Sequence, residues 1–259
     1  MTSLRALGEP LCASGLDWRA AINAVAYGDG IKTKEGRQIS FVDQSELPAH
    51  SSYEAFIHAS GTVPTRENLH DFFNAMMWLR YPRIKVRLNA LQAAGLIAEQ
   101  GVGKKDVASM PMHRSRLRDA LTLFDENTAI VAISDPSLSA LLRSHAWAAL
   151  FIDRRSALST CYEVFPFGHA LIEKLVTPYK AITAHAWLVP VAPDFFAQPL
   201  GDKVAYLDAT VALQLDEKLQ PAAFSPLPVL GLPNWWPAQD DDFYADQQVF
   251  RQRRYSANN

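Results

Sequence analysis

The stretch that decides the fold runs from Gly61 to Lys85 and reads GTVPTRENLHDFFNAMMWLRYPRIK. A helix is expected after Pro64, because Thr65 is a favourable N-cap residue and Glu67 places a negative charge in the first turn. Apolar side chains then recur at i, i+3, i+4, i+7 and i+8, the spacing of one helical face. This predicted core-facing stripe consists of Leu69, Phe72, Phe73, Met76 and Met77.

Pro82 is expected to end this helix, because proline lacks the backbone donor and disfavours a helical conformation at Tyr81. The same proline suits the first position of a second helix. The apolar seam of that second helix would be Ile84, Leu88 and Leu91. The sequence therefore predicts two helices that meet at a corner around Tyr81 and Pro82.

The rest of the chain predicts shorter elements of both kinds. Helices are expected over residues 17–27, 52–59, 136–148, 167–176 and 202–218, and strands over 38–42 and 181–191. Gly61 is expected to terminate the helix over residues 52–59. A polar loop is expected over residues 101–112. A β-hairpin is expected to join Leu121–Phe124 to Ala129–Ile133 through a polar tip at residues 125–128. Together these elements predict an α+β fold that is predominantly helical, with a small β-hairpin or sheet.

The composition does not change sharply along the chain, so residues 1–259 are predicted to form a single globular domain. From residue 221 onward prolines are frequent, which predicts extended chain. The same segment carries apolar side chains that a free linker would not have, namely Leu227, Leu230, Trp235, Trp236 and Phe243. We therefore expect residues 221–259 to form an extended proline-rich tail packed on the body.

The bulk properties exclude several classes of protein. The formal net charge is -2, so no global basic field recruits nucleic acid. No apolar run approaches the roughly 18 residues that span a bilayer, and a membrane is not an expected partner. The first residues lack the pattern of a signal peptide, and the two cysteines lack metal or redox spacing. A reducing cytoplasm is the expected location, while the sequence leaves the oligomeric state open.

Three polar residues of the first predicted helix form a candidate catalytic cluster. His70, Asp71 and Asn74 occupy one arc beside the core stripe. A histidine can act as a base or a metal ligand, and a carboxylate can orient it or bind the metal itself, which makes His70 and Asp71 candidate metal ligands too. The alternative is structural: His70 and Asn74 would hydrogen-bond to loops, and Asp71 would serve the helix N-terminus.

A second candidate pair lies on the helix that follows Phe167 and Gly168. His169 and Glu173 are four residues apart and therefore project from the same face. Such a pair can bind a divalent metal ion or work as an acid and a base, although it can equally be a structural pair. Three carboxylates, those of Asp119, Asp125 and Glu126, could complete a metal site with His70 or Asp71, and Asp119 and Asp125 are the further candidate metal ligands. The alternatives are pairing with nearby arginines for Asp119 and a turn position for Asp125 and Glu126.

Arg66, Arg83 and Lys85 are candidate substrate-binding residues, because their cationic groups suit a phosphate or a carboxylate. A solvated helix face is the alternative. Several familiar catalytic motifs are absent from the sequence, including G-x-S-x-G, H-E-x-x-H and the P-loop.

Four runs of the sequence resemble an uncharacterised bacterial family, the domain of unknown function 3025 family. They are residues 63–85, residues 119–127, residues 167–174, and the tail from Leu230 to Arg251. The sequence departs from the family at Thr128, where a glycine is typical. The resemblance implies a bacterial protein in which these runs belong to one recurring domain, and it brings no activity with it.

Two main hypotheses of function follow from the residues, and a weaker third is nucleic-acid binding through the loop from Gly101 and through Arg114 to Arg118, against which the acidic balance argues. The first is a metal-dependent, hydrolase-like enzyme that acts on an anionic substrate, with a divalent metal ion lowering the pKa of a bound water. The second is a non-catalytic module that binds a small molecule or a protein. The sequence does not decide between an enzyme and a binding module.

Overall fold

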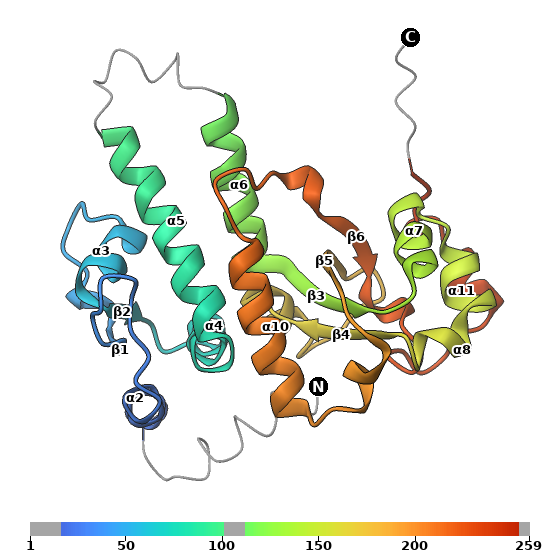
Figure 1. Ribbon diagram of the computed structural model, residues 1–259, viewed down its shortest axis with the longest axis horizontal. Coiled ribbons are helices and arrows are strands. Elements are labelled where there is room, and N and C mark those ends of the chain that lie inside the picture. Colours follow the sequence, from blue (N-terminus) through green and yellow to red (C-terminus); the bar gives the residue numbers. More distant parts are fainter. Residues whose placement is uncertain (1–16, 101–111, 254–259) are drawn as a thin grey trace. The chain divides into compact units, whose positions relative to one another are not determined.

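The computed structural model describes residues 17–100 and 112–253 (Figure 1), so the predicted loop at 101–112 falls almost entirely outside the described part. The described chain is mainly helical with two small sheets, which confirms the predicted α+β class. It forms two compact units that interleave along the sequence. The first runs to Asp125 and adds Pro199–Pro221, and the second takes Glu126–Gln198 and everything from Ala222. That the two units form one domain stays a prediction.

The first unit is built from helices and one parallel pair of strands. Its helices are α2 (Trp18–Gly28), α3 (Tyr53–Ser60), α4 (Leu69–Arg80), α5 (Pro82–Gln100), nearly all of α6 (Met112–Asn127), and α10 (Leu200–Gln214), with the short 3-10 turn η1 (Gln44–Glu46). Its strands are β1 (Ser40–Asp43) and β2 (Thr62–Thr65), with Phe41 opposite Val63. Helix α5 packs against both α3 and α10. The core joins Ile22, Phe41, Val63 and Trp78.

Gly61 ends α3, as the sequence predicts, and strand β2, which the sequence does not predict, begins directly after it. Its φ of 78° lies in the left-handed region, and its amide donates to the carbonyl of Ile57 at 2.8 Å. A side chain at this position would also overlap the backbone carbonyl of Gln38. Only glycine satisfies both conditions, since it has no Cβ.

The first predicted helix begins later than expected. Pro64 and Thr65 belong to strand β2, and the Thr65 hydroxyl donates to the carbonyl of Val42 at 2.7 Å instead of capping a helix. The cap of α4 is Asn68, whose side-chain oxygen accepts from the amide of Asp71 at 2.8 Å. The prediction failed because β1, a distant segment, offers this stretch a strand partner that local propensity does not reveal.

The buried face of α4 also differs from the predicted stripe. Leu69 is 53% exposed, whereas Asp71, Asn74 and Trp78 are only 6%, 8% and 2% exposed. Met76 and Met77 are buried as predicted, and Phe72 and Phe73 are half-buried. The buried face is therefore wider than the predicted stripe and includes polar residues, while Leu69 lies outside it. Polar residues can occupy a buried face where partners satisfy their hydrogen bonds, and the partners of Asp71 and Asn74 come from other parts of the first unit.

The predicted β-hairpin is wrong. Residues 121–124 belong to helix α6, which continues to Asn127, and the chain then enters strand β3 (Thr128–Ile133) directly. Ala120, Leu121 and Phe124 are buried at i, i+1 and i+4, which is a helical face. A short apolar run fits both a strand and a helix, and here the helix was the right choice.

The second unit is built on a four-stranded sheet. Its order is β4 (Tyr162–Pro166), β3, β5 (Thr183–Pro190) and β6 (Ser225–Pro228). The two central strands are parallel, and each outer strand is antiparallel to its neighbour. All six residues of β3 are buried, which explains its continuous apolar sequence. The helical elements are α7 (Pro136–Ser144), η3 (Ala149–Asp153), α8 (Arg155–Leu158), α9 (His169–Lys174), η4 (Pro193–Ala197), η5 (Pro221–Ala223), η6 (Val229–Gly231) and α11 (Asp241–Ala245).

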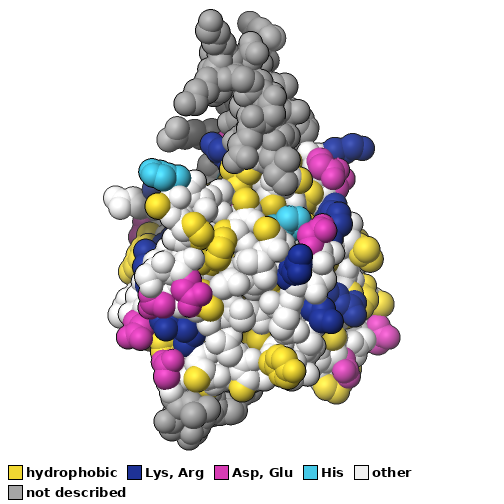
Figure 2. Space-filling view, turned by 90° about the vertical axis from the view of Figure 1, so that its left-hand side faces the viewer, with side chains coloured by type: hydrophobic (Ala, Val, Ile, Leu, Met, Phe, Trp, Pro, Cys, Tyr) yellow, Lys and Arg dark blue, Asp and Glu magenta, His cyan; other side chains and the backbone are white. Residues whose placement is uncertain are grey.

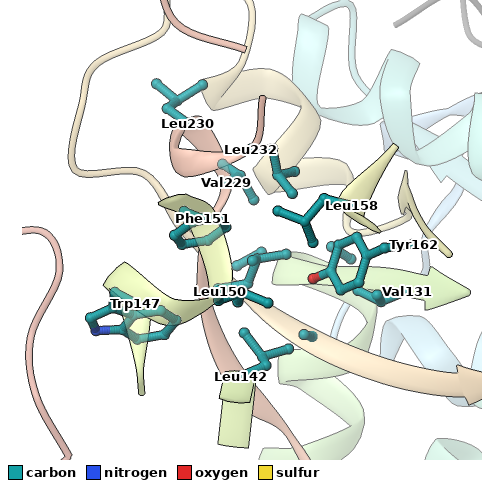
Figure 3. Close-up of a cluster of buried hydrophobic side chains, with 14 of the residues drawn as sticks. Val131, Leu142, Trp147, Leu150, Phe151, Leu158, Tyr162, Val229, Leu230 and Leu232 are labelled. Carbon is teal, nitrogen blue, oxygen red and sulfur yellow. The ribbon is translucent and has the colours of Figure 1, made fainter. Parts of the chain in front are cut away.

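The core of the second unit is a large apolar cluster (Figure 3). Tyr162 lies beside Leu158 and Val131, and its hydroxyl points into the cluster. Apolar side chains from beyond residue 221 join the same core, among them Leu227, Leu230, Phe243 and Phe250. This segment is only partly extended: strand β6 is extended, whereas η5, η6 and α11 are helical.

The surface carries both signs of charge. The face that shows the side of α2 and α3 has acidic and basic side chains spread among one another (Figure 2). This distribution agrees with a formal net charge close to zero. Among the described helices, none is long and apolar enough to cross a bilayer.

Candidate functional site

A buried polar cluster in the first unit contains two predicted site residues, Asn74 of α4 and Lys85 of α5. The Lys85 ammonium group donates to the Asn74 side-chain oxygen at 2.8 Å and to the Asp125 carboxylate at 2.5 Å. The Asn74 amide in turn donates to the hydroxyl of Tyr53 at 3.3 Å. Lys85 is only 4% exposed, so this ion pair compensates a charge that burial would otherwise make costly.

The surroundings close this cluster off from solvent. The Lys85 ammonium lies 5.4 Å from the centre of the Trp78 ring, within range of a cation–π interaction. Burial raises the pKa of Tyr53 well above its usual value, and the negative charges of Glu54 and Asp125 add to the effect. The cavity at the cluster is about 10 Å³, close to the space of one water molecule. The arrangement therefore joins α3, α4, α5 and α6, and it leaves no room for a substrate.

The carboxylate of Asp71 is bound within its own unit by Arg66. It accepts from the Arg66 backbone amide at 2.6 Å and from the guanidinium at 2.9 and 3.1 Å. Burial opposes ionisation of Asp71, but the hydrogen bonds from Arg66 outweigh it and lower the pKa of this carboxyl. The neighbouring His70 is half-buried in the first turn of α4. The guanidinium of Arg66 therefore has a partner within the protein, the carboxylate of Asp71. Its role in binding a substrate stays a prediction.

In the second unit, His169 at the start of α9 lies against Glu126 at the end of α6. The His169 Nε2 atom is 3.4 Å from a carboxylate oxygen of Glu126. The histidine side chain is 5% exposed and the glutamate side chain 39% exposed. A buried imidazole beside a carboxylate that reaches solvent is an arrangement able to serve a metal ion or a proton transfer.

Gly168 makes this approach possible. The amides of Phe167 and Gly168 both donate to the carbonyl of Thr128, at 3.0 and 2.8 Å. A Cβ atom on Gly168 would overlap the backbone of Glu126 and Asn127. Glycine therefore lets α9 begin directly against the junction of α6 and β3, and this contact places His169 beside Glu126.

The separation of the two ligand-type atoms suits a tetrahedral metal ion. Zinc bonds to histidine nitrogen and carboxylate oxygen are about 2.1 Å long, so two ligand atoms at the tetrahedral angle lie about 3.4 Å apart. The distance between Glu126 and His169 is 3.4 Å, whereas an ordinary N–H···O hydrogen bond is about 2.9 Å long. The spacing of this pair is compatible with two ligands of one metal ion, and a histidine–glutamate ion pair has the same spacing.

The remaining predicted residues are distributed over both units. Asp119 is exposed on α6, and Glu173 follows His169 on the next turn of α9. Three residues have side chains that could bind a metal ion: Glu126 and His169 in the second unit, and His70 in the first. The convergence of His70 with His169, which the sequence suggests, stays a prediction.

Arg83, the third predicted substrate-binding residue, lines a pocket of the first unit with a volume of about 590 Å³. Its backbone amide and that of Ile84 donate to the buried carboxylate of Asp208, at 3.1 and 2.9 Å. Asp208 carries no signal in the sequence, because it caps a helix that begins more than a hundred residues earlier. Glu126 is one of the three carboxylates that the sequence offers as metal ligands, but it lies at the C-terminal end of helix α6 and not in the predicted turn.

Comparison with known proteins finds one family. A family model described as a protein of unknown function (DUF3025) matches residues 39–254. The match covers most of the chain and includes all four of the runs that resemble this family. No curated protein and no solved structure matches the chain.

Proposed function

The chain belongs to the DUF3025 family, whose description assigns no activity, and we propose from its own residues that it binds a divalent metal ion and uses the ion to hydrolyse an anionic substrate. The observation that carries the proposal is the spacing of 3.4 Å between His169 and Glu126. Imidazole and carboxylate together are the ligands of many hydrolytic zinc centres. The cysteine pattern supports a reducing cytoplasm as the place of this activity.

The environment of the pair suits a catalytic ion better than a structural one. Catalytic zinc sites hold about three protein ligands and keep one position open for water, whose pKa the metal lowers to about 7. Glu126 reaches solvent, so an ion bound to it would be accessible to water. The further ligands are proposed among Glu173 and the first-unit candidate His70. Asp71 and Asp125 are weaker choices, because a metal would have to displace Arg66 from one and Lys85 from the other.

The proposal is tested by titrating chelator-treated protein with Zn²⁺ and Mn²⁺ in a calorimeter. Replacing His169 by Ala, or Glu126 by Gln, should weaken binding at least about tenfold, the size typical of a lost ligand or its support. Glu163→Gln is the matched control, because it removes a carboxylate from β4 of the same unit, and its affinity should equal that of the native protein. Equal affinities of all three variants would refute the metal centre.

Gly168 offers a second test of the same centre. A methyl group at Gly168 would push α9 away from Glu126, so Gly168→Ala should lower metal affinity although it removes no ligand. Gly95→Ala is its control, since nothing lies within 4 Å of a Cβ there, and it should bind metal normally. Unchanged affinity in Gly168→Ala would show that the approach of α9 does not position the ligands.

Hydrolysis is assayed separately from metal binding. With the metal bound, p-nitrophenyl phosphate and bis(p-nitrophenyl) phosphate serve as anionic test substrates, and turnover should disappear with a chelator and in His169→Ala. Metal binding without turnover of these or related phosphate and carboxylate esters would favour the alternative, a non-catalytic binding module.

A further inference from the structure

The first unit contains a pocket beside Arg83 that the metal centre does not use. It has a volume of about 590 Å³, within the roughly 300–1,000 Å³ typical of sites for small organic ligands. Three segments form it: residues 29–34, one face of α5 and one face of α10. All of them belong to the first unit, and none of the lining residues is a candidate metal ligand.

The walls on the two helices are apolar and made of small side chains. Helix α5 contributes Val86 and Ala90, and α10 contributes Ala209 and Ala212. Short side chains leave the space between the helices open, and they present an apolar surface to whatever enters it. Leu213 lies at the same pocket and is 87% exposed, so a bound apolar group would gain from covering it.

The pocket is also strongly basic. Lys32, Lys34, Arg83 and Arg87 line it, against a single carboxylate, Asp29. The Arg83 guanidinium is also attracted by the neighbouring Asp208 carboxylate, whereas Lys32 and Lys34 form no ion pair with another residue in the described part of the chain. Four cations around one cavity repel one another, and a bound anion relieves that repulsion.

The side chains, and not the helix N-terminus, are the groups able to hold this anion. The carboxylate of Asp208 already accepts from the amides of Arg83 and Ile84 at the start of α5. The same contact ties α10 to α5, so the two apolar walls are held together without a ligand. Arg87 is anchored as well, through a hydrogen bond from its Nε to the carbonyl of Leu215 at 2.8 Å. The pocket is thus pre-formed, which lowers the cost of binding.

We propose that this pocket binds a small organic anion with an apolar body. The apolar part would pack on Val86, Ala90 and Ala212, and a phosphate or carboxylate head would be held by Arg83 and the two lysines. This site goes beyond the proposed metal centre, because it needs no metal and acts in the other unit.

The probes that test it are decyl phosphate and decanoate, each below its micelle concentration, with inorganic phosphate and decanol as the two halves of the ligand. Calorimetric titration of the full chain should show binding of at least one amphiphile at least about tenfold tighter than either half, a difference of about 1.4 kcal/mol. Tight binding of decyl phosphate alone, or of decanoate alone, identifies the head group. An amphiphile that binds no better than phosphate or decanol overturns the proposal.

Variants locate the binding. The double substitution Lys32→Gln with Arg83→Gln should weaken the amphiphile at least about tenfold, because two of the head-group cations are lost. Arg37→Gln is the matched control, since it removes an exposed cation near the same segment but outside the pocket, and it should bind normally. Equal binding by both overturns the assignment of the site.

A filled pocket gives an independent result. Ala212→Phe keeps every cation and occupies the apolar wall, so it should reduce amphiphile binding while its thermal unfolding stays close to that of the native protein. Full binding by Ala212→Phe contradicts the proposal. Metal titrations of these variants should match the native protein, so failure of the pocket and failure of the metal centre are distinguishable.

Discussion

The polar residues of α4 show that the role of a side chain is predicted less well by its residue type than by the groups it contacts. Asp71 and Asn74 were predicted on the border of a cleft, and both are buried. Asn74 is held by Lys85 and Tyr53, and Asp71 by Arg66. These partners are separated from α4 residues by 5 positions for Arg66, 11 for Lys85 and 21 for Tyr53. The structural role of Asp71 is thus established by its contacts, while the catalytic role stays a prediction.

Asp71 should stabilise the fold in a pH-dependent way. At neutral pH, Asp71→Asn should cost about 1–2 kcal/mol of unfolding free energy, because the carboxylate accepts three hydrogen bonds from Arg66. The pKa of Asp71 is lowered in the fold, so its contribution is present above the unfolded value of about 3.9 and is lost as the pH falls through the lower folded value.

Urea unfolding at a series of pH values measures this effect. The stability difference between native protein and Asp71→Asn should be full above about pH 5 and shrink below about pH 4. Asp119→Asn, which changes an exposed aspartate, should differ from the native protein by less than about 0.5 kcal/mol. A difference for Asp71→Asn that is independent of pH would show that the carboxylate charge is not what stabilises.

Two buried tyrosines of the second unit form a natural comparison. The Tyr162 hydroxyl is buried without a hydrogen-bond partner among the described residues, and burial raises its pKa. Tyr162→Phe should therefore be neutral or stabilising by up to about 1 kcal/mol, since it removes an unsatisfied polar group. The Tyr244 hydroxyl donates to Gly231 and accepts from Arg155, so Tyr244→Phe should lose about 1 kcal/mol. Thermal unfolding compares the two variants, and Tyr162→Phe should have the higher melting temperature. A higher melting temperature for Tyr244→Phe would contradict this account.

At the scale of elements, contacts between distant segments decided the boundaries that local signals missed. Strand β2 forms in place of a first helical turn because β1 pairs with it. Residues 121–124 continue a helix because their buried positions follow the helical period. The corner at Pro82 was predicted correctly, since a proline acts through its own backbone and needs no partner.

The start of α5 should depend on a cap from α10. Asp208 accepts from the second and third residues of α5 and is 5% exposed. Burial raises the pKa of this carboxyl, although the two amides oppose the shift. Asp208→Ala should cost about 1–2 kcal/mol, the range of a lost N-cap.

Chemical denaturation checks this value. Asp202→Ala is the control on the same helix, because Asp202 is exposed in the first turn of α10, and it should cost less than about 1 kcal/mol. If the two variants lose the same stability, the hydrogen bonds from α5 to Asp208 stabilise the fold no more than the charge of an exposed aspartate in the first turn of a helix.

At the scale of the whole molecule, each unit is completed by a segment that returns from later in the sequence. The first unit is completed only when the chain returns at Pro199–Pro221, and the second only after Ala222. A chain that ends at Gln198 lacks α10 of the first unit and β6 and α11 of the second. We expect it to unfold without a cooperative transition, since both units lose buried apolar area.

Circular dichroism during heating tests this expectation. A chain that ends at Arg253 keeps every described element and should unfold as cooperatively as the full chain. A chain of residues 1–198 that melts like the full chain would show that one unit folds without its returning segment.

By itself the sequence determined the helical α+β class, the corner at Pro82, the glycine stop at Gly61 and the family, because these depend on local backbone chemistry and on motif order. Only the tertiary structure decided which face of α4 is buried, that Glu126 lies beside His169, and that Asp208 caps α5. Those contacts join residues from separate elements, and their energies depend on burial and on distances that only the folded chain brings about. The basic pocket beside Arg83 belongs to the same class, since its cations are scattered along the sequence and meet only in the fold.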